Sequence, residues 1–164
     1  MAFVVPRPAL HAGWRDGGNR ASFTELTRAE GPLGMLAYQG GVAAGWCSVG
    51  PRSRYSVAQS PRSILRGRDP AEDDDVWLVP CFFVRVGFRR AGLTAELLDA
   101  AVDRAARNGA RAIEGWPIAD TYRAAETFEG REHVFTKCGF TCVARPSPRR
   151  AIMRKELAYD PRSP

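Results

Sequence analysis

Residues 76–94 read VWLVPCFFVRVGFRRAGLT and combine the most apolar run of the chain with a turn that contains glycine and arginine. The run from Val76 to Val86 is rich in Val and Phe, which predicts a central strand covered on both faces. Pro80 interrupts it, and because proline cannot donate to a strand ladder it indicates a bulge or a free edge. A helix is expected from about Gly92 to Asn108, with Gly109 as its C-terminal cap. The segment therefore predicts a strand–turn–helix unit.

The turn between this strand and this helix has the chemistry of an anion site. Backbone N–H groups at a helix start lack partners within the helix, and with the positive end of the helix dipole they suit a pyrophosphate. Gly92 permits the backbone to approach a phosphate closely, and Arg89 and Arg90 add positive charge. A strand-to-helix turn that binds nothing can carry the same residue types. The six-residue pattern alone leaves both interpretations open.

The segments on either side predict further elements of a mixed α/β domain around one largely central sheet. The expected elements, in chain order, are a helix over 22–30, a hairpin over 35–49, the strand–turn–helix unit, a strand over 110–115, a short helix that begins near Glu129 and stops at Gly139, and a final hairpin of strands 140–146 and 150–157. Residues 1–18 are interpreted as an irregular lead-in, and a single domain is expected to span 1–164.

Residues 51–75 predict a long connection rather than a regular element. It carries five arginines, then an acidic run over 72–75, and a short helix is expected near Ser60–Leu65. Connections of this length in compact domains are often functional. The acidic run is interpreted either as a solvated loop or as a surface that attracts a cationic amine.

The composition is that of an ordinary globular protein. The 164 residues are 45% hydrophobic and 26% charged, which excludes a disordered chain. No apolar run is long enough for a membrane span, and Met1 to Pro8 is too short and too proline-rich for a signal peptide, so a cytoplasmic protein without membrane contact is expected. Four cysteines without a CxxC pair and two histidines predict reduced thiols and no metal site.

The charge balance is basic and points to a polyanionic partner. The net charge is +6, from 22 Arg and 2 Lys against 18 acids, and the sequence pI is about 9.6. Such a balance suits a nucleic acid or a phosphorylated small molecule. The arginines of residues 52–68 favour the former, but they are not interleaved with aromatic residues and acids follow them directly. A nucleic-acid-binding domain is therefore kept as the alternative.

The order of these elements resembles the GNAT superfamily of acetyl-CoA-dependent N-acetyltransferases, in particular its bacterial members. The resemblance covers about residues 33–157 and includes the closing Gly139-Phe140. Arg89 to Thr94 stand where the family has its Arg/Gln-x-x-Gly-x-Gly/Ala acetyl-CoA loop, although Thr94 departs from the usual small residue. The resemblance implies a mixed sheet with splayed strands, acetyl-CoA as co-substrate, an amine acceptor and no metal.

The resemblance also implies a division of labour among the residues. The backbone of Phe82, Phe83 and Val84 is expected to pair with the pantetheine arm, and a strand amide near Phe83 to meet the oxyanion. The pyrophosphate is expected on the loop residues Arg89, Arg90, Ala91, Gly92, Leu93 and Thr94. Phe135 stands where many members carry a tyrosine that protonates the departing coenzyme A, so it is expected to be only a wall of the thioester pocket.

Acetyl transfer to an amine also needs a base or desolvation near neutral pH. Glu114 is the acid of the short strand that faces the expected cleft, and it is the first candidate; its alternative role is a carboxylate paired with an arginine such as Arg111. His133, on the last helix, is a second candidate acid or base, or a half-exposed helix residue. The residues leave open the acceptor, the acyl chain, the oligomeric state (a homodimer among the options) and an acyl-CoA sensor without catalysis.

Overall fold

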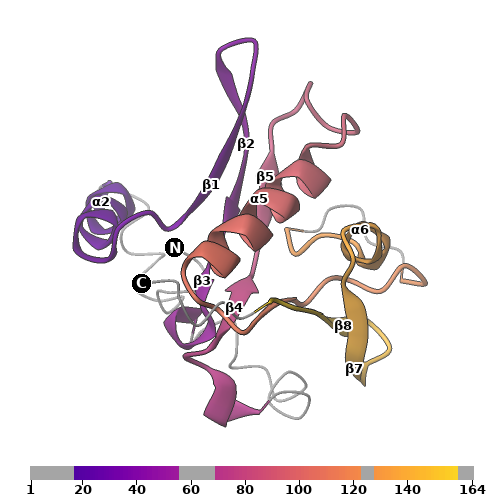
Figure 1. Cartoon of the computed structure of the whole chain (residues 1–164). Coiled ribbons are helices and arrows are strands. Elements are labelled where there is room, and N and C mark those ends of the chain that lie inside the picture. Colours follow the sequence, from indigo (N-terminus) through magenta and orange to yellow (C-terminus); the bar gives the residue numbers. More distant parts are fainter. Residues whose placement is uncertain (1–16, 56–68, 123–127, 159–164) are drawn as a thin grey trace.

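The eight strands of the described residues form two sheets. The computed structural model describes residues 17–55, 69–122 and 128–158, and Figure 1 shows their arrangement. The antiparallel sheet has the order β1 (Gly34–Gln39), β2 (Val42–Ser48), β5 (Phe82–Val84). The mixed sheet has the order β3 (Gly50–Pro51), β4 (Val76–Val79), β6 (Ala112–Gly115), β8 (Arg150–Glu156), β7 (Thr141–Ser147), with β4 and β6 parallel.

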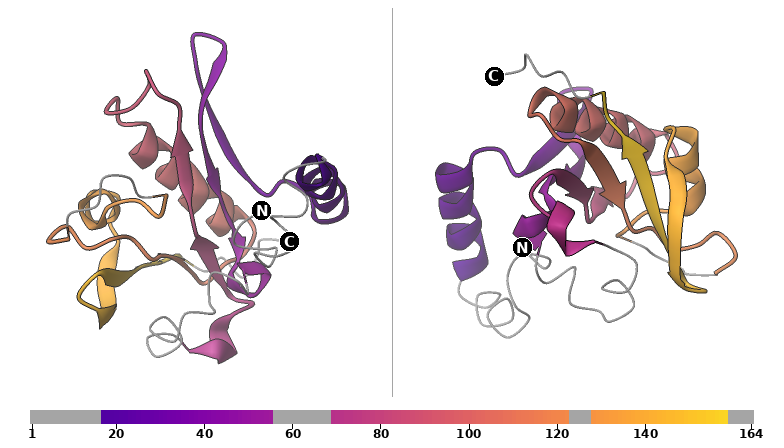
Figure 2. Two further views of the ribbon diagram at one scale, coloured as in Figure 1. Left: turned by 180° about the vertical axis from the view of Figure 1, so that it is seen from behind. Right: turned by 60° about the horizontal axis from the view of Figure 1, so that its bottom comes forward.

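Two helices cover one side of these sheets, and a third stands at their edge. The helices are α2 (Gly18–Glu30), α5 (Leu93–Arg107) and α6 (Glu132–Lys137), with short 3-10 turns η1 (Arg52–Tyr55) and η2 (Pro70–Glu72). The long helix α5 lies across β1 and β2 and also contacts α6. By contrast, α2 has no buried residue and lies beside the β1–β2 sheet in Figure 2, which it contacts through the edge-on pair Phe23–Trp46 at a centroid distance of 6.4 Å.

The strand β4 is buried on both faces, as its apolar sequence predicts. Trp77 and Val79 belong to the main core together with the apolar face of α5. Leu78 points to the other face, where it packs in a second cluster with Tyr55 and Ile152. Because successive side chains of a strand alternate between faces, a strand that is buried on both faces requires a continuous apolar run.

Pro80 marks the point at which the two sheets part. β4 pairs with β6 up to Val79 and Gly115, and Pro80 then has no N–H to continue the ladder. The chain crosses over, with the Cys81 carbonyl accepting from Ser48 N–H, and continues as β5 beside β2. The predicted single strand over 76–86 is therefore two strands in two sheets, and the splayed strands that the resemblance implied are confirmed.

Other expectations differ in detail. The hairpin β1–β2 turns at Gly40-Gly41 as predicted, and α5 begins one residue after Gly92. The first helix begins four residues earlier than expected, so Ser22 lies inside it rather than capping it. Glu129 precedes α6. The helix expected near 60–65 lies outside the described residues, as do residues 1–16 of the lead-in.

Two features are absent from the described residues. None of the helices there is both long and apolar enough to cross a bilayer. No group of three or more His, Cys, Asp or Glu side chains in that part of the chain has a geometry suited to a metal ion.

Candidate active site

A cavity of about 670 Å³ lies between β5, the loop that follows it, the start of α5, and α6. Phe82, Phe83 and Val84 line it from the strand. From the loop and the first turn of α5 come Arg89, Arg90, Gly92, Leu93 and Thr94. Of the loop residues singled out in the sequence, Ala91 is the one that does not line the wall. The cavity thus brings the predicted strand and the predicted anion loop to one place.

The loop before α5 has the backbone conformation of an anion-binding nest. Arg90 and Gly92 both adopt positive φ, at 65° and 86°, and Gly92 is the N-cap of α5. The first N–H groups that bond within the helix belong to Ala95 and Glu96, which donate to the Gly92 carbonyl. The N–H groups of Leu93 and Thr94 come before them and have no carbonyl within the helix. Such a turn concentrates outward-pointing donors at the positive end of the helix dipole.

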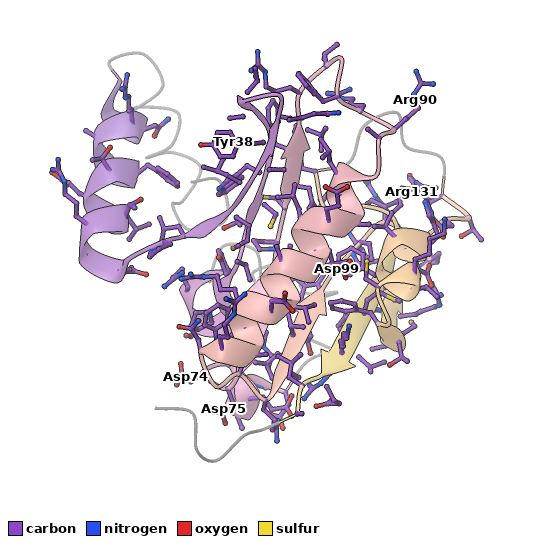
Figure 3. The ribbon with its side chains drawn as sticks, turned by 45° about the horizontal axis from the view of Figure 1, so that its top comes forward. Tyr38, Asp74, Asp75, Arg90, Asp99 and Arg131 are labelled. Atoms are coloured by element: carbon purple, nitrogen blue, oxygen red, sulfur yellow. The ribbon has the colours of Figure 1, made fainter. Side chains whose placement is uncertain are left out.

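The charged side chains that line the cavity are cationic. They are Arg89, Arg90, Arg131, Lys137 and, when protonated, His133, and no carboxylate is among the described lining residues. Figure 3 shows Arg90 and Arg131 at the end of the molecule where α5 begins, and Asp74 and Asp75 near the opposite end of that helix. This distribution favours an anionic ligand in the cavity. Asp74 and Asp75 lie far from this cavity, so they are badly placed to attract an amine to it.

The free edge of β5 exposes a different set of backbone groups from the one expected. Arg85 N–H donates to the Ala44 carbonyl of β2, so by alternation the backbone N–H of Phe83 also faces β2. The backbone groups of Phe82 and Val84 point the opposite way, toward the cavity. There the Phe82 N–H donates to the Phe128 carbonyl at 2.6 Å. The Phe83 amide, expected near the oxyanion, is therefore turned away, although its side chain lines the cavity.

Glu114 lies in the protein interior, outside the cavity. Its side chain is 3% exposed and accepts from Arg52 Nη1 at 3.0 Å, from Trp116 Nε1 at 3.2 Å and from Arg154 Nη1 at 3.4 Å. Arg52 itself is fully buried. The alternative considered from the sequence, an arginine-paired carboxylate, describes this geometry, but the partners are Arg52 and Arg154 rather than Arg111. Both carboxylate oxygens are therefore occupied by donors, and neither faces the cavity.

The acidic run is part of the same network. Asp73 accepts from Arg52 Nε at 2.7 Å, and Glu72 is paired with Arg111 and with Arg154. The hydrogen bond from Arg154 is the main cause that lowers the pKa of Glu72 below its ordinary value of 4.5. These two acids are structural ion-pair partners rather than solvated loop residues.

This lowered pKa predicts a pH dependence of stability. A carboxyl whose folded pKa lies below its unfolded value contributes stability above the unfolded value and loses it as the pH falls through the folded one. The free energy of unfolding should therefore decrease from about pH 5 downward, with Glu72 contributing. Urea titrations between pH 6 and pH 3 measure this, and Arg154→Gln should reduce the slope. An identical slope in that variant would contradict the assignment.

His133 lies on the cavity wall and has a partner that the sequence did not reveal. Its Nδ1 is 2.8 Å from Asp120 Oδ1, and its backbone N–H donates to Asp120 Oδ2 at 2.9 Å. Asp120 follows β6, and a bridge between Ile118 and Arg131 brings that segment alongside the start of α6. The two residues are 13 apart, so no local pattern could have paired them.

Phe135 lies behind the cavity wall instead of in it. Its ring is fully buried and makes edge-on contacts with Phe82 and Phe140, at centroid distances of 6.0 and 5.3 Å. Gly115 makes room for it, since a Cβ there would lie 2.0 Å from a Phe135 ring carbon. The expected wall residue is therefore a core residue that supports Phe82.

The sequence matches the model of a known protein family. A model described as the Acetyltransferase (GNAT) family matches residues 5–140. The chain belongs to the GNAT acetyltransferase family. The resemblance found in the sequence is thus confirmed, together with the mixed α/β fold that it implied. No curated protein gives a significant match to this GNAT sequence.

Solved structures of similar fold include several acetyltransferases. Ribosomal-protein-alanine N-acetyltransferase from Brucella melitensis is 18% identical with a TM-score of 0.57, and the match covers 92% of this chain and 93% of that one. yncA from Salmonella typhimurium, solved with its cofactor acetyl-CoA, is 17% identical with a TM-score of 0.58, covering 89% and 76%. Ard1 from Thermoplasma volcanium is 17% identical with a TM-score of 0.53, covering 84% and 79%. At these identities the likeness establishes the fold.

Proposed function

We propose that this GNAT protein transfers the acetyl group of acetyl-CoA directly to a primary amine of a small molecule or peptide. The observation that carries the proposal is the cavity, in which the nest at Arg90 and Gly92 lies next to the free edge of β5. A nest and a cationic rim suit a pyrophosphate, and a strand edge suits an arm that contains amide groups. Acetyl-CoA has both parts in one molecule.

The residues present fit this co-substrate. The amides of residues 90–94 are proposed to hold the pyrophosphate, and Val84, whose backbone faces the cavity, to bond the pantetheine arm. Arg89 Nε donates to the Val84 carbonyl at 3.2 Å, so this side chain has to move if that carbonyl is to accept from the arm. The Phe82 N–H on this edge already donates to the Phe128 carbonyl, so the Val84 N–H is the proposed strand donor to the oxyanion.

Direct transfer is favoured over a covalent cysteine intermediate. Cys81 is the cysteine next to β5, and burial raises the pKa of its thiol to about 11. Such a thiol stays protonated at neutral pH and is a weak nucleophile. In direct transfer, the neutral amine nitrogen attacks the thioester carbonyl, the amine loses a proton, and the C–S bond breaks. Coenzyme A leaves as a thiolate, which needs little acid assistance because reference thiol pKa values are near 8.5.

Substitution of Gly92 tests the proposed pyrophosphate site. Gly92→Asp places a negative charge beside the loop amides, whereas Gly92→Asn imposes a similar backbone cost at positive φ without the charge. We expect the Asp variant to bind acetyl-CoA at least about tenfold more weakly than the Asn variant, or 1.4 kcal/mol. Isothermal titration calorimetry with both folded variants measures this. Equal affinities would place the pyrophosphate elsewhere.

Release of free thiol tests the reaction itself. The protein is incubated with acetyl-CoA and, separately, with ethanolamine, spermidine, tryptamine or an alanine-terminated peptide, and coenzyme A is followed by a thiol reagent. Amine-dependent release supports a transferase. Saturable acetyl-CoA binding without release for any amine would instead support an acyl-CoA sensor.

A further inference from the structure

Asp120 holds His133 at the cavity with two contacts from one carboxylate. Asp120 Oδ1 contacts the imidazole Nδ1 at 2.8 Å, and Oδ2 accepts the backbone N–H of the same residue at 2.9 Å. A carboxylate only accepts hydrogen bonds, so Nδ1 carries the hydrogen. In the neutral imidazole, Nε2 is then the proton acceptor. The pair therefore fixes both the position of the ring and its tautomer.

The position of His133 along α6 is at the β5 end of the cavity. Just before α6, Phe128 accepts the Phe82 N–H, and a Cβ on Gly130 would lie 3.3 Å from the Phe82 ring. At the other end of the helix, Cys138 Sγ lies 3.9 Å from the Ala95 carbonyl in the first turn of α5. His133 is in the first turn of α6, and Lys137 is one turn later, about 6 Å along the axis. Lys137 is thus nearer the phosphate loop, and His133 is nearer the strand.

Other titratable groups do not compete with His133 for this role. Glu114 lies outside the cavity and is paired with Arg52, and Phe135 has no proton to exchange. The charged groups near this pair include Arg131, whose Nε is 3.5 Å from Asp120 Oδ1, and Lys137 on the same helix. Arg145 also interacts electrostatically with Asp120 and is paired with Glu132. Among the described lining residues, His133 is the one whose side chain has a ring nitrogen that can both accept and return a proton.

We infer that His133 Nε2 accepts the proton of the acceptor amine and that Asp120 is its positioning residue. This rests on the proposed function and names how that site handles its proton. The amine nitrogen forms a bond to the acetyl carbon, the imidazole takes the proton that the nitrogen loses, and the C–S bond breaks. The imidazolium then returns the proton to the coenzyme A thiolate. One group thus acts as base and acid, and from the neutral amine the transfer releases no net proton.

The test compares His133→Gln with the unchanged protein, using the alkylamine from the panel that gives the fastest thiol release. The expected result is a fall in kcat/KM of at least about 10²-fold, with unchanged acetyl-CoA affinity. The unchanged protein should lose activity as the pH falls, because a protonated imidazole cannot accept, and this acidic limb should be absent from the variant.

Asp120→Asn tests the positioning role separately. It keeps an acceptor for the backbone N–H but removes the negative charge, so we expect the acidic limb to move to lower pH. Thr136→Ala is the structural control, since this exposed hydroxyl bonds only within its own helix, and its rate and pH profile should be unchanged.

The outcomes separate this inference from the proposed function. If the unchanged protein releases thiol but His133→Gln keeps its rate and its acidic limb, the inference is overturned and the acetyltransferase stands. If no amine gives release with the unchanged protein, the proposed transfer fails and this inference fails with it. A fall in rate for His133→Gln that leaves the acidic limb in place would indicate a structural role for His133 and would also overturn the inference.

Discussion

Replacing Glu114 by glutamine should lower the free energy of unfolding by about 1.5–3 kcal/mol, the range for a hydrogen bond to a charged group. The reason is Arg52, which is fully buried and has Glu114 3.0 Å from its Nη1. Glutamine is similar in size and can accept a hydrogen bond, but it cannot balance the charge. Asp73 would remain as the nearest acid to this guanidinium. Urea unfolding followed by tryptophan fluorescence measures the change.

Two further measurements make this prediction specific. They are the stability of a matched control variant and the turnover of Glu114→Gln per folded molecule. Glu156→Gln also removes a carboxylate that contacts Arg154, but the Glu156 side chain is 67% exposed, and exposed pairs contribute about 0–1 kcal/mol. If Glu114 were instead the catalytic base, its glutamine variant would keep its stability, and its turnover would fall about 10²–10⁴-fold. The two results are opposite, so one set of measurements decides between a structural and a catalytic carboxylate.

The features that could be predicted from the sequence are those determined within a few residues. The apolar run over β4, the anion loop and the following helix depend on local rules of periodicity, on the fixed φ of proline and on glycine at positive φ. Pro80 could be recognised as an interruption because of its missing N–H. The strands on either side of Pro80 could not be assigned to their sheets from the sequence. The choice of β2 as the partner of β5 depends on packing against α5.

The features that could not be predicted depend on pairs far apart in the chain. Arg52 and Glu114 are 62 residues apart, and nothing near either residue marks its partner. The direction of the Phe83 N–H depends on the register between β2 and β5, where a shift by one residue reverses every backbone group. The role of Asp120 could not be predicted because this residue lies in an irregular segment. In each case the sequence supplied the right kind of side chain without its geometry.

The second large effect is expected at Phe135, where alanine should lower the free energy of unfolding by about 3–5 kcal/mol. The ring is fully buried between Phe82 and Phe140, so its removal leaves a cavity behind the β5 wall. Urea unfolding measures the loss, and Phe135→Leu, which fills most of the space, should lose less. A loss below about 1 kcal/mol for the alanine variant would show that the ring is not part of the core.

The space opposite the ring gives this prediction its sharpest check. A Cβ on Gly115 would lie 2.0 and 2.4 Å from two Phe135 ring carbons, so Gly115→Ala should be strongly destabilising in the unchanged protein. Leucine lacks those outer ring atoms, and Gly115→Ala should therefore be much less costly in a Phe135→Leu background. Contacting residues show such non-additivity, and a double-mutant cycle measures it as about 0.5–3 kcal/mol. Additive losses of stability would mean that Gly115 and the Phe135 ring do not fit against each other.

Phe135→Tyr has to place a hydroxyl in this occupied, apolar space. We therefore expect it to lower the free energy of unfolding rather than to supply an acid.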